Sequence, residues 1–231
     1  MPLTSIPKAG DRKIYLRTFF DRVYPMFPVL NIEIFQSKVE MLANQDLKTL
    51  RQEDIPLLAC AYCVFALGAD ENAGRCTEEG WTYLAAAFNL FTHIVSMPYF
   101  VSVQALLLLT VTLKSRNKDG CGAQALTQAI RIAQSLGLHH ISVTKTESTI
   151  GEALVHADVD LDARCWWVCY CLEISFGLGI GRPILIRGGS YHQVIPESTG
   201  NFFCLWIRLC IIQSRLYEAI YARPAEARNG S

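Results

Sequence analysis

Apolar residues recur along this chain with the period of α-helices rather than with the alternation of strands. The two stripes nearest the N-terminus are Tyr15, Phe19 and Val23, followed by Phe35, Val39 and Leu42. Pro25 is expected to end the first helix, because the residue before a proline is pushed out of helical geometry. Asn31 is expected to cap the second helix through its side-chain oxygen.

Two nearly all-apolar segments, Ile55 to Ala69 and Val101 to Leu113, predict helices buried on all sides. Gly68 is expected to end the first of these helices, and Gly120 to break the chain after the second. Both segments are shorter than the roughly 20 residues that a membrane-spanning helix needs. Buried helices of a folded domain therefore explain them better than membrane spans.

The remaining stripes predict four more helices. A helix that starts at Thr77 is expected to bury Trp81, Leu84, Phe88, Phe91 and Val95. The next helix should bury Leu126, Ile130 and Ala133 and end at Gly137, before a loop at residues 142–151. A third carries Leu161, Cys165, Val168, Leu172 and Phe176, and is expected to end in Gly177, Gly179 and Gly181. The last carries Phe202, Leu205, Leu209, Ile212 and Leu216, and Pro224 ends it.

The pattern predicts an all-α fold, a single domain of about seven to nine helices. We place this domain at residues 11–223, with an N-terminal tail at 1–10 and a disordered tail at 224–231. The only strand-like run, Ile184 to Ile186, is too short to predict a sheet.

Composition and charge narrow the classes of function. The chain has 231 residues, 51% of them apolar, which is enough for a buried core. Its 21 basic and 21 acidic residues balance, so no net field would hold it on nucleic acid. The polar N-terminus does not resemble a secretory signal, which leaves the nucleus or the cytosol.

Nine cysteines are many for this length, and most lie in apolar stretches where cysteine acts as a small apolar residue. Cys60 and Cys63 match C-x-x-C, but no second pair follows at the spacing of a zinc site. His139 and His140 are adjacent, and neighbouring side chains should point apart. We therefore expect no metal site and no cofactor in this chain.

Catalytic motifs fail on inspection, so we do not expect an enzyme. The Gly177 to Gly181 run lacks the spacing of a dinucleotide loop and follows a predicted helix where a strand is needed. The Gly188-Gly189-Ser190 run lacks the final glycine of a nucleophile elbow. Asp158, Asp160 and Asp162 are interpreted as residues that cap the start of a helix rather than as an acid and base pair.

Several short sequence motifs, which we call phrases, occur in this order and carry a family resemblance. They are Tyr24-Pro25-Met26-Phe27-Pro28, the run from Ser102 to Leu109, the run from Ala129 to His140, the run from Asp160 to Trp167, and Gly181-Arg182-Pro183. Together they resemble the fungal-specific transcription factor domain, which is the middle homology region of fungal zinc binuclear cluster transcription factors. The zinc cluster itself needs six cysteines within about thirty residues beside basic residues. That pattern is absent from this sequence.

The resemblance implies a structural signature made of Arg164, Trp166, Glu173, Gly181, Arg182 and Pro183. We expect these residues to hold the fold rather than to contact a ligand. Glu173 and Ile174 stand where family members commonly place Asp and Arg, and Glu173 would keep the charge if its partner is Arg182. The family domain extends further than this chain, so the domain is expected to be truncated at its C-terminal end.

The resemblance also implies a function. We expect a nuclear regulatory domain that responds to an effector and controls a metabolic gene set, with secondary metabolism as one setting. DNA would be reached only through a separate or partner zinc-cluster module, the one place where zinc is expected. Candidate partners are a small-molecule effector, another protein or a second copy of the chain. We expect no membrane partner. The alternatives are a small-molecule-binding or enzymatic helical domain and an inactive remnant, and the target genes, effector and oligomeric state stay open.

Overall fold

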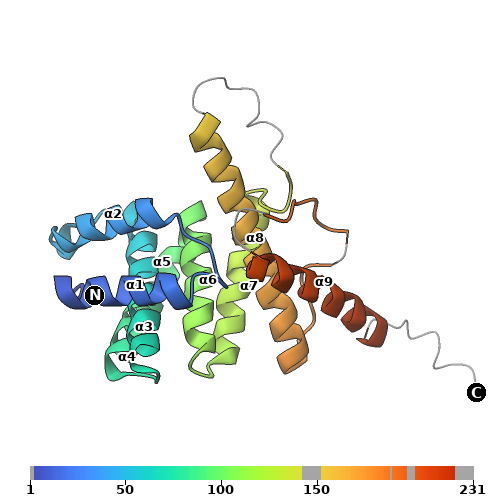
Figure 1. Cartoon of the computed structure of the whole chain (residues 1–231), viewed down its shortest axis with the longest axis horizontal. Helices are drawn as coiled ribbons and strands as arrows, with labels where there is room; N and C mark the ends of the chain where they lie inside the picture. Colours follow the sequence, from blue (N-terminus) through green and yellow to red (C-terminus); the bar gives the residue numbers. More distant parts are fainter. Residues whose placement is uncertain (1–2, 142–151, 188, 197–200, 222–231) are drawn as a thin grey trace, which may run out of the picture.

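The structure is a computed structural model that describes residues 3–141, 152–187, 189–196 and 201–221. Helices follow one another along these residues, as Figure 1 shows. They are α1 (Ala9–Arg22), α2 (Ile32–Ala43), α3 (Ile55–Ala73), α4 (Glu78–Asn89), α5 (Phe91–Ser96), α6 (Phe100–Lys114), α7 (Asp119–Ser135), α8 (Glu152–Ile180) and α9 (Asn201–Tyr221). Two short 3-10 turns, η1 (Leu47–Thr49) and η2 (Gln52–Asp54), precede α3. The all-α prediction is confirmed, whereas the predicted loop at 142–151 and the tail at 224–231 lie outside the described residues.

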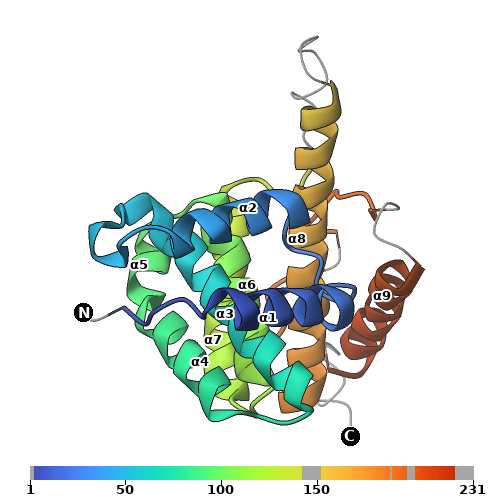
Figure 2. The ribbon, with the colours of Figure 1, turned by 60° about the vertical axis from the view of Figure 1, so that its left-hand side comes forward.

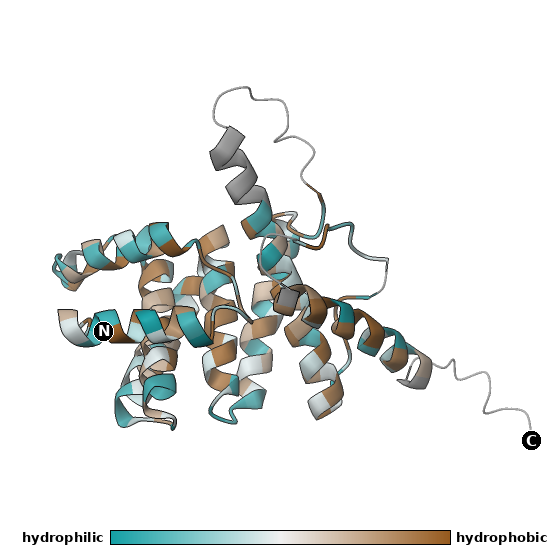
Figure 3. Ribbon diagram, in the orientation of Figure 1, coloured by the Kyte–Doolittle hydropathy of each residue, from teal (hydrophilic) through white to brown (hydrophobic). Residues whose placement is uncertain are grey.

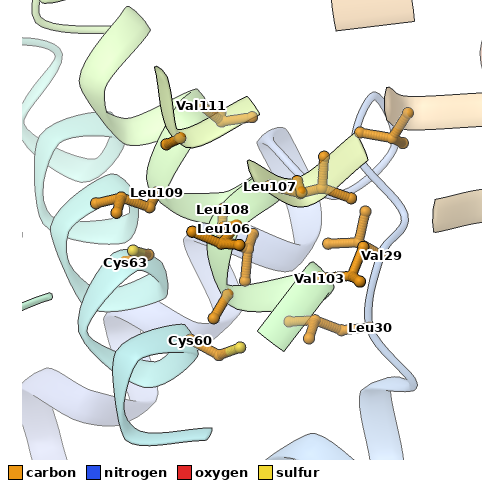
Figure 4. Close-up of a cluster of buried hydrophobic side chains, with 14 of the residues drawn as sticks. Val29, Leu30, Cys60, Cys63, Val103, Leu106, Leu107, Leu108, Leu109 and Val111 are labelled. Carbon is orange, nitrogen blue, oxygen red and sulfur yellow. The ribbon is translucent and has the colours of Figure 1, made fainter. Parts of the chain in front are cut away.

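The core is built around α3 and α6, which pack against each other. Helices α1 and α4 lie against α3, α7 lies against α6, and the series continues through α8 to α9. Figures 1 and 2 show the same order from two sides. Figure 4 shows α6 between two neighbours: Cys60 and Cys63 of α3 lie on one side, and Val29 and Leu30 of the segment after α1 lie on the other. The two apolar segments are buried as predicted, except that Ile55, Leu57 and Val101 at their N-terminal ends are partly buried.

The predicted cap at Asn31 and the predicted helix start at Thr77 are both confirmed. The Asn31 side chain accepts a hydrogen bond from the backbone N–H of Ile34 at 3.1 Å at the start of α2. The Thr77 hydroxyl accepts one from the backbone N–H of Gly80 at 2.9 Å at the start of α4. Each bond satisfies a donor that the helix leaves unpaired in its first turn.

The prediction that Gly68 ends a helix is wrong. Helix α3 continues through Gly68 and ends at Gly74, whose φ of 63° lies in the left-handed region that glycine adopts readily. A side chain at Gly68 would overlap the backbone of Tyr15 in α1. Gly68 is therefore a point of close approach between α1 and α3, so this glycine indicates helix packing rather than a helix end.

The predicted apolar stripe of α4 is also wrong in part. Leu84 is buried, but Trp81 and Phe88 are 42% and 44% exposed, and the chain turns at Leu90 before α5 begins. At Trp81 a neighbouring cation covers one face of the ring. The ring of Trp81 lies 5.1 Å from the guanidinium of Arg116, which forms a buried ion pair with Asp70.

Of three other expected helix ends, two fall elsewhere and one is confirmed. Gly120 lies in the first turn of α7, and the break before it uses Asn117, which has a φ of 56°. Helix α8 continues through Gly177 and Gly179 and ends before Gly181, whose φ is 68°. Gly137 follows the end of α7 as predicted, with a φ of 76°.

Asp160 and Asp162 do not cap a helix start, because α8 already begins at Glu152. The side chain of Asp158 lies outside the described residues. Asp160 instead lies one turn before Arg164, and its carboxylate is 3.0 Å from the Nε of that arginine. The acidic residue therefore serves an ion pair within the helix.

The prediction of which face of α9 is buried is wrong. The buried residues of α9 are Phe203, Ile207, Cys210 and Ser214. The predicted residues, Phe202, Leu205, Leu209, Ile212 and Leu216, are all exposed.

Among the helices that the structure describes, none has both the length and the apolar character to cross a bilayer.

Candidate functional site

The turn after α1 contains the first motif of the family, Tyr24 to Pro28, and backbone hydrogen bonds define its shape. The N–H of Tyr24 donates to the carbonyl of Phe19 at 2.9 Å, and the N–H of Phe27 donates to that of Val23 at 3.2 Å. Pro25 has no N–H to donate and fixes its own φ, so the helix cannot continue through it. The chain then passes into the core at Val29, which is fully buried.

Arg164 of α8 binds this turn, although it lies far from the turn in the sequence. It is only 8% exposed, and its Nη1 donates to the Tyr24 hydroxyl at 2.8 Å and to the Pro28 carbonyl at 3.1 Å. The Tyr24 hydroxyl in turn donates to the carbonyl of Leu30 at 3.0 Å. Together with the Asp160 carboxylate, these acceptors surround a buried cation that would be costly to leave unpaired.

Gln104 of α6 also binds the turn. Its Nε2 donates to the carbonyl of Val29 at 2.6 Å. The thiol of Cys165, next to Arg164, also approaches that carbonyl, at 3.7 Å. We name the group of Tyr24, Val29, Gln104, Asp160 and Arg164 the turn clamp. It joins phrases that are up to 140 positions apart in the chain.

Sequence reasoning named Arg164 but missed the role of Gln104. The available signal was a single amide side chain in the otherwise apolar run of α6, at 7% exposure. A buried amide needs a partner, and such a partner comes from a segment without regular backbone pairing. Here that segment is the turn at Val29.

Trp166 lies next to the turn clamp on α8 and is completely buried. Its ring lies 5.7 Å from the ring of His139 and 6.1 Å from the ring of Tyr191, measured between centroids. The indole N–H of the neighbouring Trp167 donates to the carbonyl of Val194 at 2.8 Å. These aromatic residues fasten the segment at 190–196 to α8.

The histidines do not behave as expected, since the rings of His139 and His140 lie 3.8 Å apart rather than pointing away from each other. His192 pairs with the same segment, because its N–H donates to the carbonyl of His139 at 2.8 Å. Burial lowers the pKa of His139, and the neighbouring His140 lowers it further. Among the described residues, no group of three side chains is arranged to hold a metal ion.

The end of α8 contains the rest of the predicted signature. Glu173 is buried, and its Oε1 accepts from the backbone N–H of Leu185 at 2.6 Å. Burial raises the pKa of Glu173, while this hydrogen bond and the charge of Arg182 oppose the rise. The carbonyl of Arg182 accepts from the Tyr217 hydroxyl of α9 at 3.2 Å. Gly181 ends the helix, and Pro183 lies exposed in the connection that follows.

Cys60 and Cys63 of the C-x-x-C motif are both fully buried in α3. Burial raises the pKa of the Cys63 thiol to about 12 and that of Cys60 well above its usual value. A thiolate, the form that binds metals and attacks disulfides, is therefore disfavoured at both positions.

A groove of about 860 Å³ lies between α1 and α2. Arg12 and Glu40 form an ion pair at 2.7 Å in this groove, and the hydrogen bond from Arg12 lowers the pKa of Glu40. The lining residues are Ala9, Arg12, Lys13, Leu16, Arg17, Phe20, Asp21, Glu33, Gln36, Ser37 and Glu40. The groove combines an apolar base with charges of both signs on its walls.

The geometry defines a class: an all-α domain in which the buried polar groups described above connect distant segments. A family comparison makes the class specific. The chain matches the family described as "Fungal specific transcription factor domain" over residues 16–204, and it belongs to that family. The turn clamp lies entirely within the matched residues.

Relatives named as transcription factors cover most of the chain. An ABC-transporter-regulating transcription factor of Aspergillus fumigatus is 24% identical, covering 97% of this chain and 26% of its own length. Cutinase transcription factor 1 beta of Fusarium vanettenii is 25% identical, with 84% and 22% covered. The sorbicillinoid biosynthetic cluster transcription factor sor3 of Hypocrea jecorina is 26% identical, with 80% and 26% covered. The chain thus spans about a quarter of these relatives' length, and no solved structure matches it significantly.

Proposed function

We propose that this chain is the regulatory domain of a nuclear transcription factor that controls a metabolic gene set. In this proposal the chain does not read DNA itself, and a separate or partner zinc-cluster module does so. The family match over residues 16–204 carries the proposal, and the buried hydrogen bonds that join the matched segments around Tyr24, Gln104 and Arg164 support it. The relatives' printed names, which refer to transporter regulation and a biosynthetic cluster, suggest the kind of target.

Charge and cysteine chemistry support the division of labour with a DNA-binding module. Balanced charge gives no long-range attraction to phosphate, and non-specific DNA binding depends on that attraction. Six of the nine cysteines are buried in the helical core rather than gathered in a metal-binding segment. The proposal assigns no catalytic role to the chain.

The regulatory step is proposed to be a shift between a masked and an active arrangement of the helical body. An effector can bias such a shift only if it binds one arrangement more tightly than the other. The groove between α1 and α2 is the proposed effector site. Lys13 and Arg17 line it from α1, and Glu33 lines it from α2. This lining suits a small molecule with an apolar body and groups of both polarities.

Tethering tests the regulatory role. The chain would be fused to a heterologous DNA-binding module, and the output of its reporter would be measured in fungal nuclei. The proposal predicts output several-fold different from that of the module alone. Arg164→Met should lose this difference, because it breaks the turn clamp that connects α8 to α1 and α6. The matched control, Arg75→Met, changes an exposed arginine and should retain the difference.

Equal output from the fusion and from the bare module, with both proteins present at the same level, would contradict the proposal. An Arg164→Met fusion as effective as the parent would contradict the role of the turn clamp. Lining variants such as Lys13→Ala with Glu33→Ala test the effector site separately, because they change exposed side chains and should leave the fold intact.

A further inference from the structure

Helix α9 is apolar on two faces, but the described part of the chain covers only one of them. Phe203, Ile207 and Cys210 are completely buried against the body. The other face carries five large apolar side chains that are each between 50% and 63% exposed: Phe202, Leu205, Leu209, Ile212 and Leu216. We name these five residues the seam. Figure 3 shows apolar residues continuing along the length of α9.

The spacing within the seam is regular. Its steps are three, four, three and four residues, which is the repeat of the a and d positions in a coiled coil. A stripe this narrow fits the side of one partner helix, whereas a helix facing a whole core carries a wider stripe. Other exposed apolar residues, such as Ile14 and Met41, lie on separate helices. The seam is thus an organised surface rather than scattered exposure.

Charge beside the seam indicates what the partner helix carries. Arg208 and Arg215 are exposed and occupy the same heptad position, seven residues apart, on one flank. The other flank carries Trp206 and Gln213, and residues 201–216 contain no acidic residue. An antiparallel second copy would place arginine against arginine, and a parallel one would place it near glutamine. Neither arrangement pairs the arginines, whereas carboxylates on the partner would do so.

The body holds α9 in place, so the seam is formed in advance. The ring of Trp206 lies 5.5 Å from that of Phe27, in the turn that the clamp holds. At the other end, Tyr217 bonds to the carbonyl of Arg182. A rigid surface reduces the ordering cost of binding to that of the partner alone.

We propose that the seam binds one amphipathic helix of a partner protein. This helix carries leucine or isoleucine at alternating three- and four-residue steps, with carboxylates along the flank that meets Arg208 and Arg215. The site goes beyond the regulatory role proposed above and does not depend on it, because it rests on the surface of α9 alone.

A designed probe tests the proposal on the full chain. The probe is a fluorescent three-heptad peptide with leucine at a and d, glutamate at e and g, and side-chain staples on its outer face that keep it helical. A matched peptide carries lysine in place of the glutamates. Fluorescence anisotropy should show the glutamate peptide binding at least tenfold more tightly than the lysine peptide. Like charges at e and g prevent either peptide from pairing with itself.

Three variants locate the binding. The double change Leu209→Glu and Ile212→Glu should weaken glutamate-peptide binding at least tenfold, and Met41→Glu on α2 should leave it unchanged. The double change Arg208→Glu and Arg215→Glu should reverse the preference in favour of the lysine peptide. All of these side chains are exposed, so circular dichroism should show unchanged helicity.

Equal affinity for the two peptides, or no binding of either by a folded chain, would overturn the proposal. Sedimentation velocity provides the other decisive outcome. A chain that self-associates at the assay concentration, and that Leu209→Glu with Ile212→Glu makes monomeric, would assign the seam to a second copy instead.

Discussion

Helices α6 and α9 both carry many large apolar residues, but the surroundings of these residues differ. The apolar side chains of α6 from Val103 to Leu113 are buried on every side, and Figure 4 shows them meeting α3 and the turn after α1. Those of α9 are buried on one face and exposed on the other. An apolar stripe thus identifies a face that favours a neighbour, but it does not say whether the described chain supplies that neighbour. The difference separates residues that hold the fold from residues that are available to bind.

Truncating one leucine in each helix should give the largest contrast. Leu108→Ala in α6 removes a completely buried side chain, so we expect the free energy of unfolding to fall by about 2–5 kcal/mol. Leu209→Ala in α9 removes a half-exposed one and should lower it by less than about 1 kcal/mol. Urea unfolding followed by circular dichroism measures both. Equal losses would mean that the seam is covered in solution.

Breaking the turn clamp tests whether polar contacts hold α8 as firmly as apolar ones hold α6. Arg164→Met should lower the free energy of unfolding by about 2–3 kcal/mol, because the Pro28 carbonyl and the Asp160 carboxylate lose a charged donor. Arg164→Lys is the conservative comparison, since one ammonium cannot reproduce the geometry of the guanidinium. A loss within about 0.5 kcal/mol for Arg164→Met would show that the clamp contributes little.

Two glycines, Gly68 within α3 and Gly74 directly after it, offer a smaller contrast between a packing role and a helix-ending role. Gly68→Ala should lower the free energy of unfolding by about 1–3 kcal/mol, because its new Cβ would push α1 away at Tyr15. Gly74→Ala meets open space and only forces a residue into left-handed geometry, so about 1 kcal/mol is expected. Thermal unfolding of the two variants side by side decides whether Gly68 is a packing glycine. The reverse order of stability would contradict that assignment.

The smallest effect concerns pH. His139 has a lowered pKa in the folded chain, so the unfolded chain takes up a proton at higher pH than the folded chain does. The free energy of unfolding should therefore be fully retained above the ordinary value of 6.5 and should decline as pH falls below it. His139→Gln should reduce this decline relative to the parent, measured by urea unfolding between pH 7 and pH 5. An identical pH profile for both proteins would remove His139 as its source.

Local features of the fold could be predicted from the sequence. The caps at Asn31 and Thr77 depend on neighbouring residues within one turn, and the burial of Phe35, Val39 and Leu42 follows from helical period. The sequence did not reveal why Gly68 is a glycine, because its contact with Tyr15 depends on how α1 crosses α3. The predicted burial of Trp81 is wrong for a related reason, since the buried Arg116 that contacts its ring lies on another segment.

The turn clamp shows the same limit. The family phrases identified Arg164 and the turn, yet only the fold reveals that Gln104 completes them. A long-range hydrogen bond leaves no periodic trace in the sequence, apart from one polar residue in an apolar run. The orientation of α9 is the clearest example, because both of its faces are apolar and period alone could not choose between them.

The central claim is that this domain regulates transcription without reading DNA itself. The most direct test titrates the purified, folded chain against duplex DNA from the promoters of the candidate gene set at near-physiological salt, and repeats the titration at lower salt. We predict no sequence-selective binding, with any weak association lost as salt rises. Tight, salt-sensitive and sequence-selective binding would contradict the account and would place a DNA-reading surface within the chain.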